Sequence, residues 1–391
     1  MRTSVTRITP RAVRPTADRA PWAIVAAAVP VHIGLALATD LSPDEAYYLC
    51  AARLGGDIVD HPPLLMWLLR LSDGWTGAPV ELRVRTWAVI FALATGLAIV
   101  VLARRRGAGP EGCALAAWVG TWALLPAAGG FVTTPDSPLL LAVTLALLAS
   151  ERTLGAVAAL AAGALAKVTA LAVAAALAVG RRKAPLAPRV ALILGPLLAL
   201  PWLWPSLRFQ LRHAFVQTAP SGWSAAAALG ALVAAVAAQA ALWSPAVLWR
   251  GFRALGTLPP ADRAVAWALT GLVLTSALVR GVPPEPNWWA PAAVVVLTAF
   301  AASAADLSLR ARRAILASVL VPTAIAMAHT ATPFLPLGER VDPTARLHGW
   351  SHGRTPDAPG VGPYGPAAER CIYKNSCAEI SSYFNSLHVH E

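Results

Sequence analysis

Two adjacent carboxylates, Asp44 and Glu45, stand near the start of the chain in the run LSPDEAYY. A carboxylate within hydrogen-bond reach of a hydroxyl or an amine can act as a general base. A structural alternative is a helix start, with Ser42 or Asp44 as the cap and Glu45 in the first turn. The same stretch continues with further polar residues, namely Asp57, Asp60 and His61. These additional polar residues favour a functional site over a simple helix cap.

A second group of ionisable residues lies further along the chain. Asp136, in TTPDSP, could orient an acceptor or share a divalent cation, or could simply cap the next helix. Lys167 is flanked by Ala, Leu, Val and Thr, so it needs an ionic partner or a phosphate unless it snorkels to the membrane boundary. Arg208 and Arg212 could contact lipid headgroups, but a guanidinium also suits bidentate phosphate binding. With His213, these cations form the candidate phosphate site.

Other polar residues have weaker signals. His61 precedes two prolines, so it could be a turn residue, a sugar contact or one metal ligand. Asn287 lies in PEPNWWAPA and could contact a sugar or an acceptor, as could Glu285, whereas the two tryptophans are typical membrane-interface anchors. The tail histidines are too scattered to indicate a metal site. We therefore predict no metal ligands, although a divalent cation remains an option for the acidic residues.

The composition indicates which elements must position these residues. Of the 391 residues, 57% are hydrophobic and 13% are charged, against roughly 25% charged in soluble domains. Apolar stretches of about twenty residues, the length that crosses a bilayer, recur between residues 21 and 334. These features exclude a soluble globular enzyme, a disordered chain and a disulfide-framed secreted domain. We predict an all-α, polytopic integral membrane protein.

The basic excess follows the predicted membrane topology. With the N-terminus inside, the predicted cytoplasmic segments hold 19 of the 32 Lys and Arg but only 5 of the 20 acidic residues. This asymmetry obeys the positive-inside rule and argues against nucleic acid as the partner of a chain with a net charge of +12. We expect a multi-pass protein of the inner (plasma) membrane, with a cytoplasmic N-terminus and an exported C-terminus.

About eleven spans are predicted. Residues 153–180 could form one long tilted helix or two short helices that turn at Lys167, and charge favours the hairpin because it keeps Arg152 and Arg181 on one side. The predicted spans cover residues 21–39, 86–103, 112–130, 137–150, 153–166, 168–180, 190–206, 225–249, 264–280, 290–305 and 314–334.

Three parts of the chain follow from these spans. Residues 1–20 form a basic cytoplasmic N-terminus, residues 21–334 the transmembrane module, and residues 335–391 a short exported tail. The module includes the long exported loop 40–85, whose run PPLLMWLLRL predicts an amphipathic interfacial helix. Cys371 and Cys377 lie in the tail, where an oxidising compartment permits a disulfide; two free thiols are the alternative.

Several motifs, taken in order, resemble one known family. DEAYY and DHPPLLMWL resemble the first external loop of the superfamily of dolichyl-phosphate-mannose and aminoarabinose transferases, which are GT-C membrane glycosyltransferases of families 39 and 83. TTPDSPLLL and ALAKVTAL resemble its second acidic motif and its lysine motif. PWLWPSLRFQLRH, PEPNWWAPA and DPTARLHGW resemble later segments in the expected order. The resemblance spans roughly residues 20–350 and is greatest to the bacterial aminoarabinose-transferase-like branch.

The resemblance implies a GT-C-type helical bundle that transfers a sugar from a polyprenyl-phosphate donor, with Asp44 as the catalytic base. Asp136 would assist catalysis, and Glu45 would support Asp44. His61, Asn287 and the four cationic residues would contact the substrates. Two departures concern acceptor recognition: Trp204 precedes Pro205 where the branch commonly has Asn, and residues 351–391 replace a larger exported domain.

We therefore expect a membrane glycosyltransferase that acts on a lipid, glycan or protein acceptor at the exported face. A transporter or flippase of a lipid-linked or polyanionic substrate is the alternative, and it would place its ionisable residues at mid-membrane on broken helices. A catalytically inactive protein that binds lipid-linked sugars is a third option.

Overall fold

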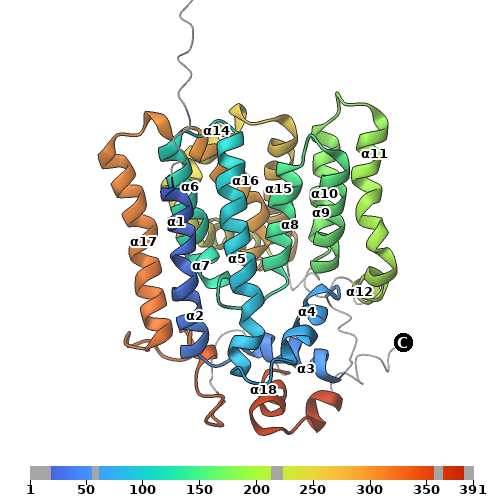
Figure 1. The fold of residues 1–391 in the computed structure, drawn as a ribbon, viewed down its shortest axis with the longest axis vertical. Coiled ribbons are helices and arrows are strands. Elements are labelled where there is room, and N and C mark those ends of the chain that lie inside the picture. The colour runs from blue at the N-terminus through green and yellow to red at the C-terminus, as the bar shows by residue number, and fades with distance from the viewer. Residues whose placement is uncertain (1–18, 55–60, 213–222, 356–363, 383–391) are drawn as a thin grey trace, which may run out of the picture.

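The chain is all-helical in the computed structural model, which describes residues 19–54, 61–212, 223–355 and 364–382 (Figure 1). The α-helices are α1 (Ala20–Ala26), α2 (Ala28–Ala38), α3 (Pro43–Leu54), α4 (Leu64–Asp73), α5 (Val80–Arg105), α6 (Pro110–Trp122), α7 (Leu124–Gly129), α8 (Asp136–Leu148), α9 (Thr153–Ala166), α10 (Thr169–Gly180), α11 (Leu186–Leu194), α12 (Leu200–Arg212), α13 (Ala225–Trp243), α14 (Pro245–Ala254), α15 (Pro260–Arg280), α16 (Ala290–Ala302), α17 (Leu309–Ala331) and α18 (Gly365–Lys374). Short 3-10 turns join several of them, including η1 (Gly195–Ala199), η3 (Pro286–Trp289) and η5 (Ala345–Leu347).

These helices follow the predicted spans and form the core of a multi-pass membrane protein. Six helical segments of the described residues are long and apolar enough to cross a membrane, namely Ala20–Ala38, Val80–Arg105, Leu186–Phe209, Ala225–Trp243, Pro260–Arg280 and Leu309–Ala331. Four shorter apolar helices, together with α6 and α7, account for the other predicted spans. The expected polytopic bundle with amphipathic helices in its first loop, α3 and α4, is confirmed.

The ambiguous region 153–180 is a helical hairpin. The backbone of Lys167 is extended, with φ −157° and ψ 136°, and it separates α9 from α10. The two helices pack against each other, and Arg181 after α10 interacts electrostatically with Glu151 before α9. The charged ends of the hairpin therefore lie together, and Lys167 lies at its opposite end.

Three of the predicted boundaries differ in the structure, and proline accounts for two of them. Residues 225–249 are not one helix, because the chain breaks at Ser244 (φ 74°) directly before Pro245, and proline disfavours a helical residue before it. Residues 112–130 divide at Ala123, where the backbone is extended before a short helix that contains Pro126. The span predicted to end at residue 206 is longer in the structure, since α12 continues through Pro205 to residue 212.

Helix α16 forms the centre of the bundle. It is apolar on all sides, and its residues from Ala290 to Ala301 are buried, as expected for a helix surrounded by other helices. Glycines allow α6 and α14 to approach it closely. A Cβ atom on Gly112 would lie 2.3 Å from the carbonyl oxygen of Ala301, and one on Gly251 would lie 2.4 Å from that of Val296. Small residues thus set the helix spacing, as in other membrane bundles.

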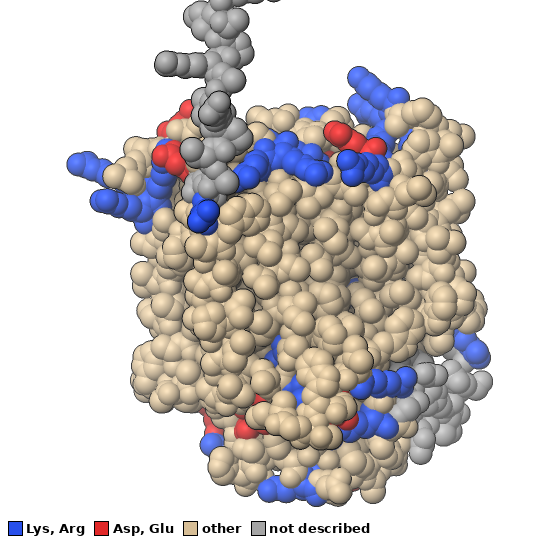
Figure 2. All heavy atoms as spheres, in the orientation of Figure 1, with Lys and Arg blue, Asp and Glu red and all other residues tan. Residues whose placement is uncertain are grey.

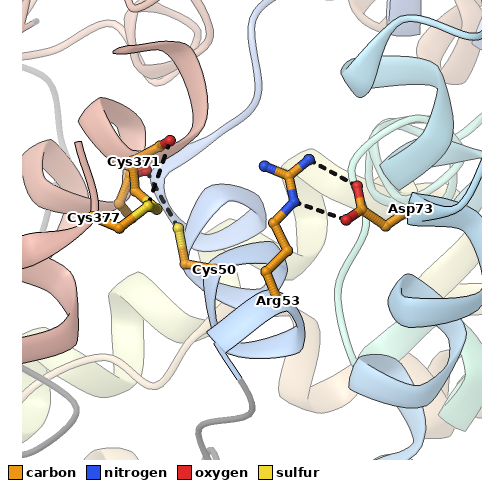
Figure 3. Close-up of a disulfide and its surroundings, with 6 residues drawn as sticks. Cys50, Arg53, Asp73, Cys371 and Cys377 are labelled. Carbon is orange, nitrogen blue, oxygen red and sulfur yellow. Dashed lines mark hydrogen bonds and ion pairs between the residues drawn. A yellow bond between two sulfur atoms is a disulfide. The ribbon is translucent and has the colours of Figure 1, made fainter. Parts of the chain in front are cut away.

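Charged side chains gather near the two ends of the molecule, and the band between them is largely uncharged on the face shown (Figure 2). Helices α3, α4 and α18 lie together at one end (Figure 1), which we call the site face. Helix α18 packs on α3, and Cys371 and Cys377 form a disulfide, so the two-thiol alternative is wrong. Figure 3 shows this disulfide beside Cys50, which donates to the carbonyl oxygen of Ala368.

Candidate active site

A polar pocket of about 140 Å³ opens among the helix ends at the site face. Its walls come from the start of α3, the segment before α8, the turn between α9 and α10, η3 and the C-terminal tail. Five of the predicted site residues contribute to it: Asp44, His61, Asp136, Lys167 and Asn287. The remaining lining residues are Tyr47, Tyr48, Thr134, Pro135, Glu285 and Tyr364. Residues far apart in the sequence thus share one site.

Helix α3 starts with a capping box that leaves Asp44 available to the pocket. The hydroxyl of Ser42 accepts from the backbone N–H of Glu45 at 3.3 Å, and the Glu45 carboxylate accepts from the N–H of Ser42 at 2.9 Å. The capping alternative is therefore correct for Ser42, with Glu45 in the first turn. Asp44 takes no part in these bonds.

Both carboxylate oxygens of Asp44 have partners from the C-terminal part of the chain. Oδ2 accepts a hydrogen bond from Nη2 of Arg346 at 2.6 Å, and Oδ1 accepts one from the Tyr364 hydroxyl at 2.6 Å. The Asp44 side chain is nevertheless 33% exposed, so it stays accessible from the pocket. An ionised carboxylate offers about four acceptor positions, and two protein contacts leave room for a substrate proton.

Glu45 lies behind the pocket and forms a buried ion pair with Arg85. Nε of Arg85 donates to Oε1 of Glu45 at 3.0 Å and Nη2 donates to Oε2 at 2.9 Å, and both side chains are fully buried. Arg85 also donates to the carbonyl oxygens of Ala36 and Thr39, and the N–H of Thr133 donates to Glu45. The pair joins the end of α2, the start of α3, α5 and the segment before α8. Glu45 therefore does not line the pocket, as a residue in direct contact with a substrate would.

Asp136, Lys167 and Asn287 contact one another in the pocket lining. Nζ of Lys167 lies 2.9 and 3.0 Å from the two oxygens of Asp136, and the amide of Asn287 donates to Asp136 at 2.8 Å. The Lys167 side chain is only 10% exposed, so it does not snorkel into solvent. Asp136 is the first residue of α8, and its oxygens accept from Lys167 and Asn287. Three chain segments are joined by this cluster.

His61 and the tyrosines form an aromatic side of the pocket. The His61 ring lies edge-on to Tyr48, with 5.8 Å between ring centroids, and Tyr47 lies 4.7 Å from Tyr364. Aromatic rings with polar tips offer both an apolar face and hydrogen bonds to a ligand. Within the described ranges, no three His, Cys, Asp or Glu side chains gather as a metal site. The option of a divalent cation stays a prediction, and Asp57 and Asp60 lie outside the described residues.

The other predicted cations are placed differently from Lys167. Arg208 lies on α12, half-buried, and is absent from the pocket lining. Arg212 ends α12, and His213 lies outside the described residues. Helix α12 is nevertheless connected to the site face, because the rings of Trp202 and Trp67 on α4 are 6.4 Å apart. Two arginines of the first loop are engaged elsewhere, since Arg53 and Arg83 both pair with Asp73. Figure 3 shows the pair of Arg53 and Asp73.

Sequence analysis missed two residues that contact Asp44. Arg346 lies within DPTARLHGW, a motif that resembled the family but gave no reason to choose its arginine. Tyr364 follows the family-like region and has no sequence signal. Tyr47 and Tyr48, by contrast, belong to DEAYY and line the pocket beside Asp44.

Comparison with known proteins supports the fold. Two solved structures are similar: ArnT from Cupriavidus metallidurans bound to undecaprenyl phosphate, with 18% identity and a TM-score of 0.57, and the same protein in the apo state, with 17% identity and a TM-score of 0.57. The matches cover 79% and 80% of this chain, but only 64% and 65% of the ArnT chains. No protein-family model and no curated protein matches the sequence. The expected aminoarabinose-transferase-like resemblance is thus confirmed as a shared membrane fold.

Proposed function

We propose that this chain is a membrane glycosyltransferase that moves a sugar from a polyprenyl-phosphate-linked donor to a lipid, glycan or protein acceptor at the exported face. The observation that carries this proposal is the pocket at the site face, which Asp44 lines together with the Asp136–Lys167–Asn287 cluster. A carboxylate, a cation and hydroxyl-binding side chains at a membrane boundary suit a substrate with a lipid phosphate and a sugar.

In this reaction Asp44 acts as the general base. A hydroxyl or amine of the acceptor attacks the anomeric carbon of the donor sugar and transfers its proton to the Asp44 carboxylate. The bond between the anomeric carbon and the phosphate oxygen breaks, with inversion, and its electron pair leaves with the polyprenyl phosphate. A phosphate is a good leaving group without prior protonation, so no strong acid is required. Asp136 and Asn287 orient the acceptor.

Lys167 lines the pocket and is the proposed contact for the donor phosphate. An ammonium has three donors, and two of them face Asp136, which leaves one for a phosphate oxygen of the donor. Arg208, Arg212 and His213 are further proposed contacts for the phosphate, and His61 contacts the sugar. The undecaprenyl phosphate bound to one ArnT structure supports a polyprenyl-phosphate ligand in this fold. Glu45 supports Asp44 through the backbone of α3.

The proposal includes a specific placement in the cell. Residues 21–334 form the catalytic module in the inner (plasma) membrane, residues 1–20 are cytoplasmic, and the loop 40–85 and the tail 335–391 are exported. The pocket lies among helix ends, whereas a transporter would need ionisable groups at mid-membrane on broken helices. This location favours transfer at one membrane surface over transport.

A reconstitution assay tests the function directly. The purified protein in nanodiscs is supplied with undecaprenyl-phosphate monosaccharides, one pentose, one hexose and one amino sugar at a time, together with an envelope lipid and glycan extract. Mass spectrometry then measures released undecaprenyl phosphate and the glycosylated acceptor. We expect one donor to be consumed by the wild type and not by Asp44→Asn. Binding of donors without consumption would instead support the inactive binding protein, and movement of intact donor across the bilayer of sealed proteoliposomes would support a flippase.

A further inference from the structure

The C-terminal tail supplies the groups that hold Asp44. Arg346 and Tyr364 are separated from Asp44 by 302 and 320 residues, yet each bonds to a different oxygen of the same carboxylate. These two contacts constrain the rotation of the carboxylate plane. With a charged donor on one oxygen and a neutral donor on the other, the protein determines the direction of the remaining acceptor positions of the carboxylate.

Tyr364 is held in place by a packed helix. It directly precedes α18, in which Ala367, Ala368 and Cys371 are buried against the core around α3. Its ring also packs against Tyr47, with 4.7 Å between centroids. Tyr364 therefore has the support that a residue needs to orient another side chain.

The opposite end of α18 is fixed independently. The hydroxyl of Tyr373 donates to Oε1 of Glu81 at 2.8 Å and accepts from the N–H of Leu41 at 2.9 Å. The disulfide between Cys371 and Cys377 closes the chain just after the helix. The two tyrosines at the ends of α18 thus have different contacts: Tyr373, within the helix, contacts the scaffold, whereas Tyr364, just before it, contacts Asp44.

We infer that Tyr364 is a positioning residue for the transfer reaction, whose phenol holds the Asp44 carboxylate in the orientation that accepts the acceptor proton. The inference rests on the proposed function. In this step the acceptor proton moves to Asp44, and Tyr364 keeps its own proton throughout. Holding a reacting group in a productive geometry is a recognised source of rate enhancement, and supporting hydrogen bonds supply it.

The variant Tyr364→Phe removes only the hydroxyl and keeps the ring contact with Tyr47. We expect kcat to fall roughly tenfold, which corresponds to one hydrogen bond to a charged group. Affinity for undecaprenyl phosphate should stay unchanged. KM for the donor should also stay near the wild-type value, because the removed hydroxyl contacts Asp44, so the loss should appear in kcat alone.

Tyr373→Phe is the matched control. It removes a phenol from α18 and weakens the docking of that helix, but it does not touch Asp44. We expect its kcat to stay near that of the wild type. An unchanged kcat in Tyr364→Phe would overturn the inference, as would an equal loss of kcat in Tyr373→Phe, which would assign the effect to helix docking.

A spectroscopic measurement tests the contact without turnover. The chain has five tyrosines, so labelling with 3-fluorotyrosine gives a simple fluorine NMR spectrum, in which Tyr364→Phe identifies the Tyr364 signal. At one pH this signal should have different chemical shifts in the wild type and in Asp44→Asn, while the Tyr373 signal is the same in both. A Tyr364 signal that is the same in Asp44→Asn as in the wild type would contradict the contact between Tyr364 and Asp44. Failure of the proposed function is recognised separately, because no donor would then be consumed by the wild type.

Discussion

The ammonium of Lys167 lies 2.9 and 3.0 Å from the two oxygens of Asp136, in the wall of the pocket and between two membrane helices. A lysine in such a setting is costly unless it is paired, and Asp136 provides the pair. The same lysine is also the proposed contact for the donor phosphate. These two roles can be separated by experiment.

Lys167→Met should weaken binding of undecaprenyl phosphate about tenfold or more, because a direct charged contact is lost. A scintillation binding assay with the labelled lipid measures the change. The double variant Lys167→Met/Asp136→Asn removes the isolated acid as well, and it should still bind more weakly than Asp136→Asn alone. Equal binding by these two variants would mean that Lys167 only neutralises Asp136.

Arg208→Ala should also weaken undecaprenyl phosphate binding. Arg208→Lys should recover only part of the affinity, because lysine keeps the charge but lacks the planar guanidinium that donates two parallel hydrogen bonds to a phosphate. The same binding assay applies. Arg310→Ala removes one exposed charge from the start of α17 and serves as the control. If Arg208→Ala binds like this control, then Arg208 is an interfacial anchor and does not belong to the phosphate site.

Asp44→Asn and Glu45→Gln should affect different properties. Asp44→Asn should reduce turnover on the order of a hundredfold with little change in thermal stability, since Asp44 is partly exposed. Glu45→Gln leaves Arg85 buried without its counter-charge, which costs about 3–5 kcal/mol. Thermal unfolding in nanodiscs, measured beside turnover, distinguishes the two. A stable Glu45→Gln protein would contradict the structural role of the pair.

The docking of α18 should weaken with rising pH. Burial of Glu369, with smaller contributions from Glu45 and Asp40, raises its pKa from 4.5 to about 10, and neither of its oxygens has a hydrogen-bond partner among the described residues. The docked carboxyl keeps a proton that the undocked one releases. The stabilisation is therefore fully present below about pH 4.5 and is lost as the pH rises toward 10.

Glu369→Gln should remove this pH dependence. Cys50 donates to Ala368 and is buried under α18, so its rate of maleimide labelling reports undocking. In a Cys113→Ala background at pH 8, Cys50 should be labelled more slowly in the Glu369→Gln variant than in the protein that keeps Glu369. Both proteins are compared at the same pH, which cancels the effect of pH on the thiol itself. Equal rates would show that Glu369 does not limit docking.

The proposed orientation predicts which positions react from outside the cell. Single cysteines at Thr76 and Ser351, both exposed and near the site face, should react with a membrane-impermeant maleimide in intact spheroplasts. A cysteine at Arg182, after α10, should react only after lysis. The reverse pattern would place the pocket on the cytoplasmic side and would contradict the exported location of transfer.

Local sequence patterns determined most of the bundle. Apolar stretches of bilayer length have one low-energy solution, a membrane helix, and charged segments indicate where each helix ends. For this reason the spans, the turn at Lys167 and the common side of Asp44 and Asp136 could be predicted. The prolines that divide 112–130 and 225–249 were visible as residues, but hydropathy averages over a window and does not detect such breaks.

Only the tertiary structure decided how the site is completed. The pairing of Glu45 with Arg85, and of Asp44 with Arg346 and Tyr364, depends on how the first loop and the tail pack against the bundle. A contact between residues about three hundred positions apart leaves no local pattern in a single sequence, because composition and periodicity describe neighbours along the chain. Packing of α18 on α3 brings Tyr364 to Asp44, and that packing results from side-chain fit in three dimensions.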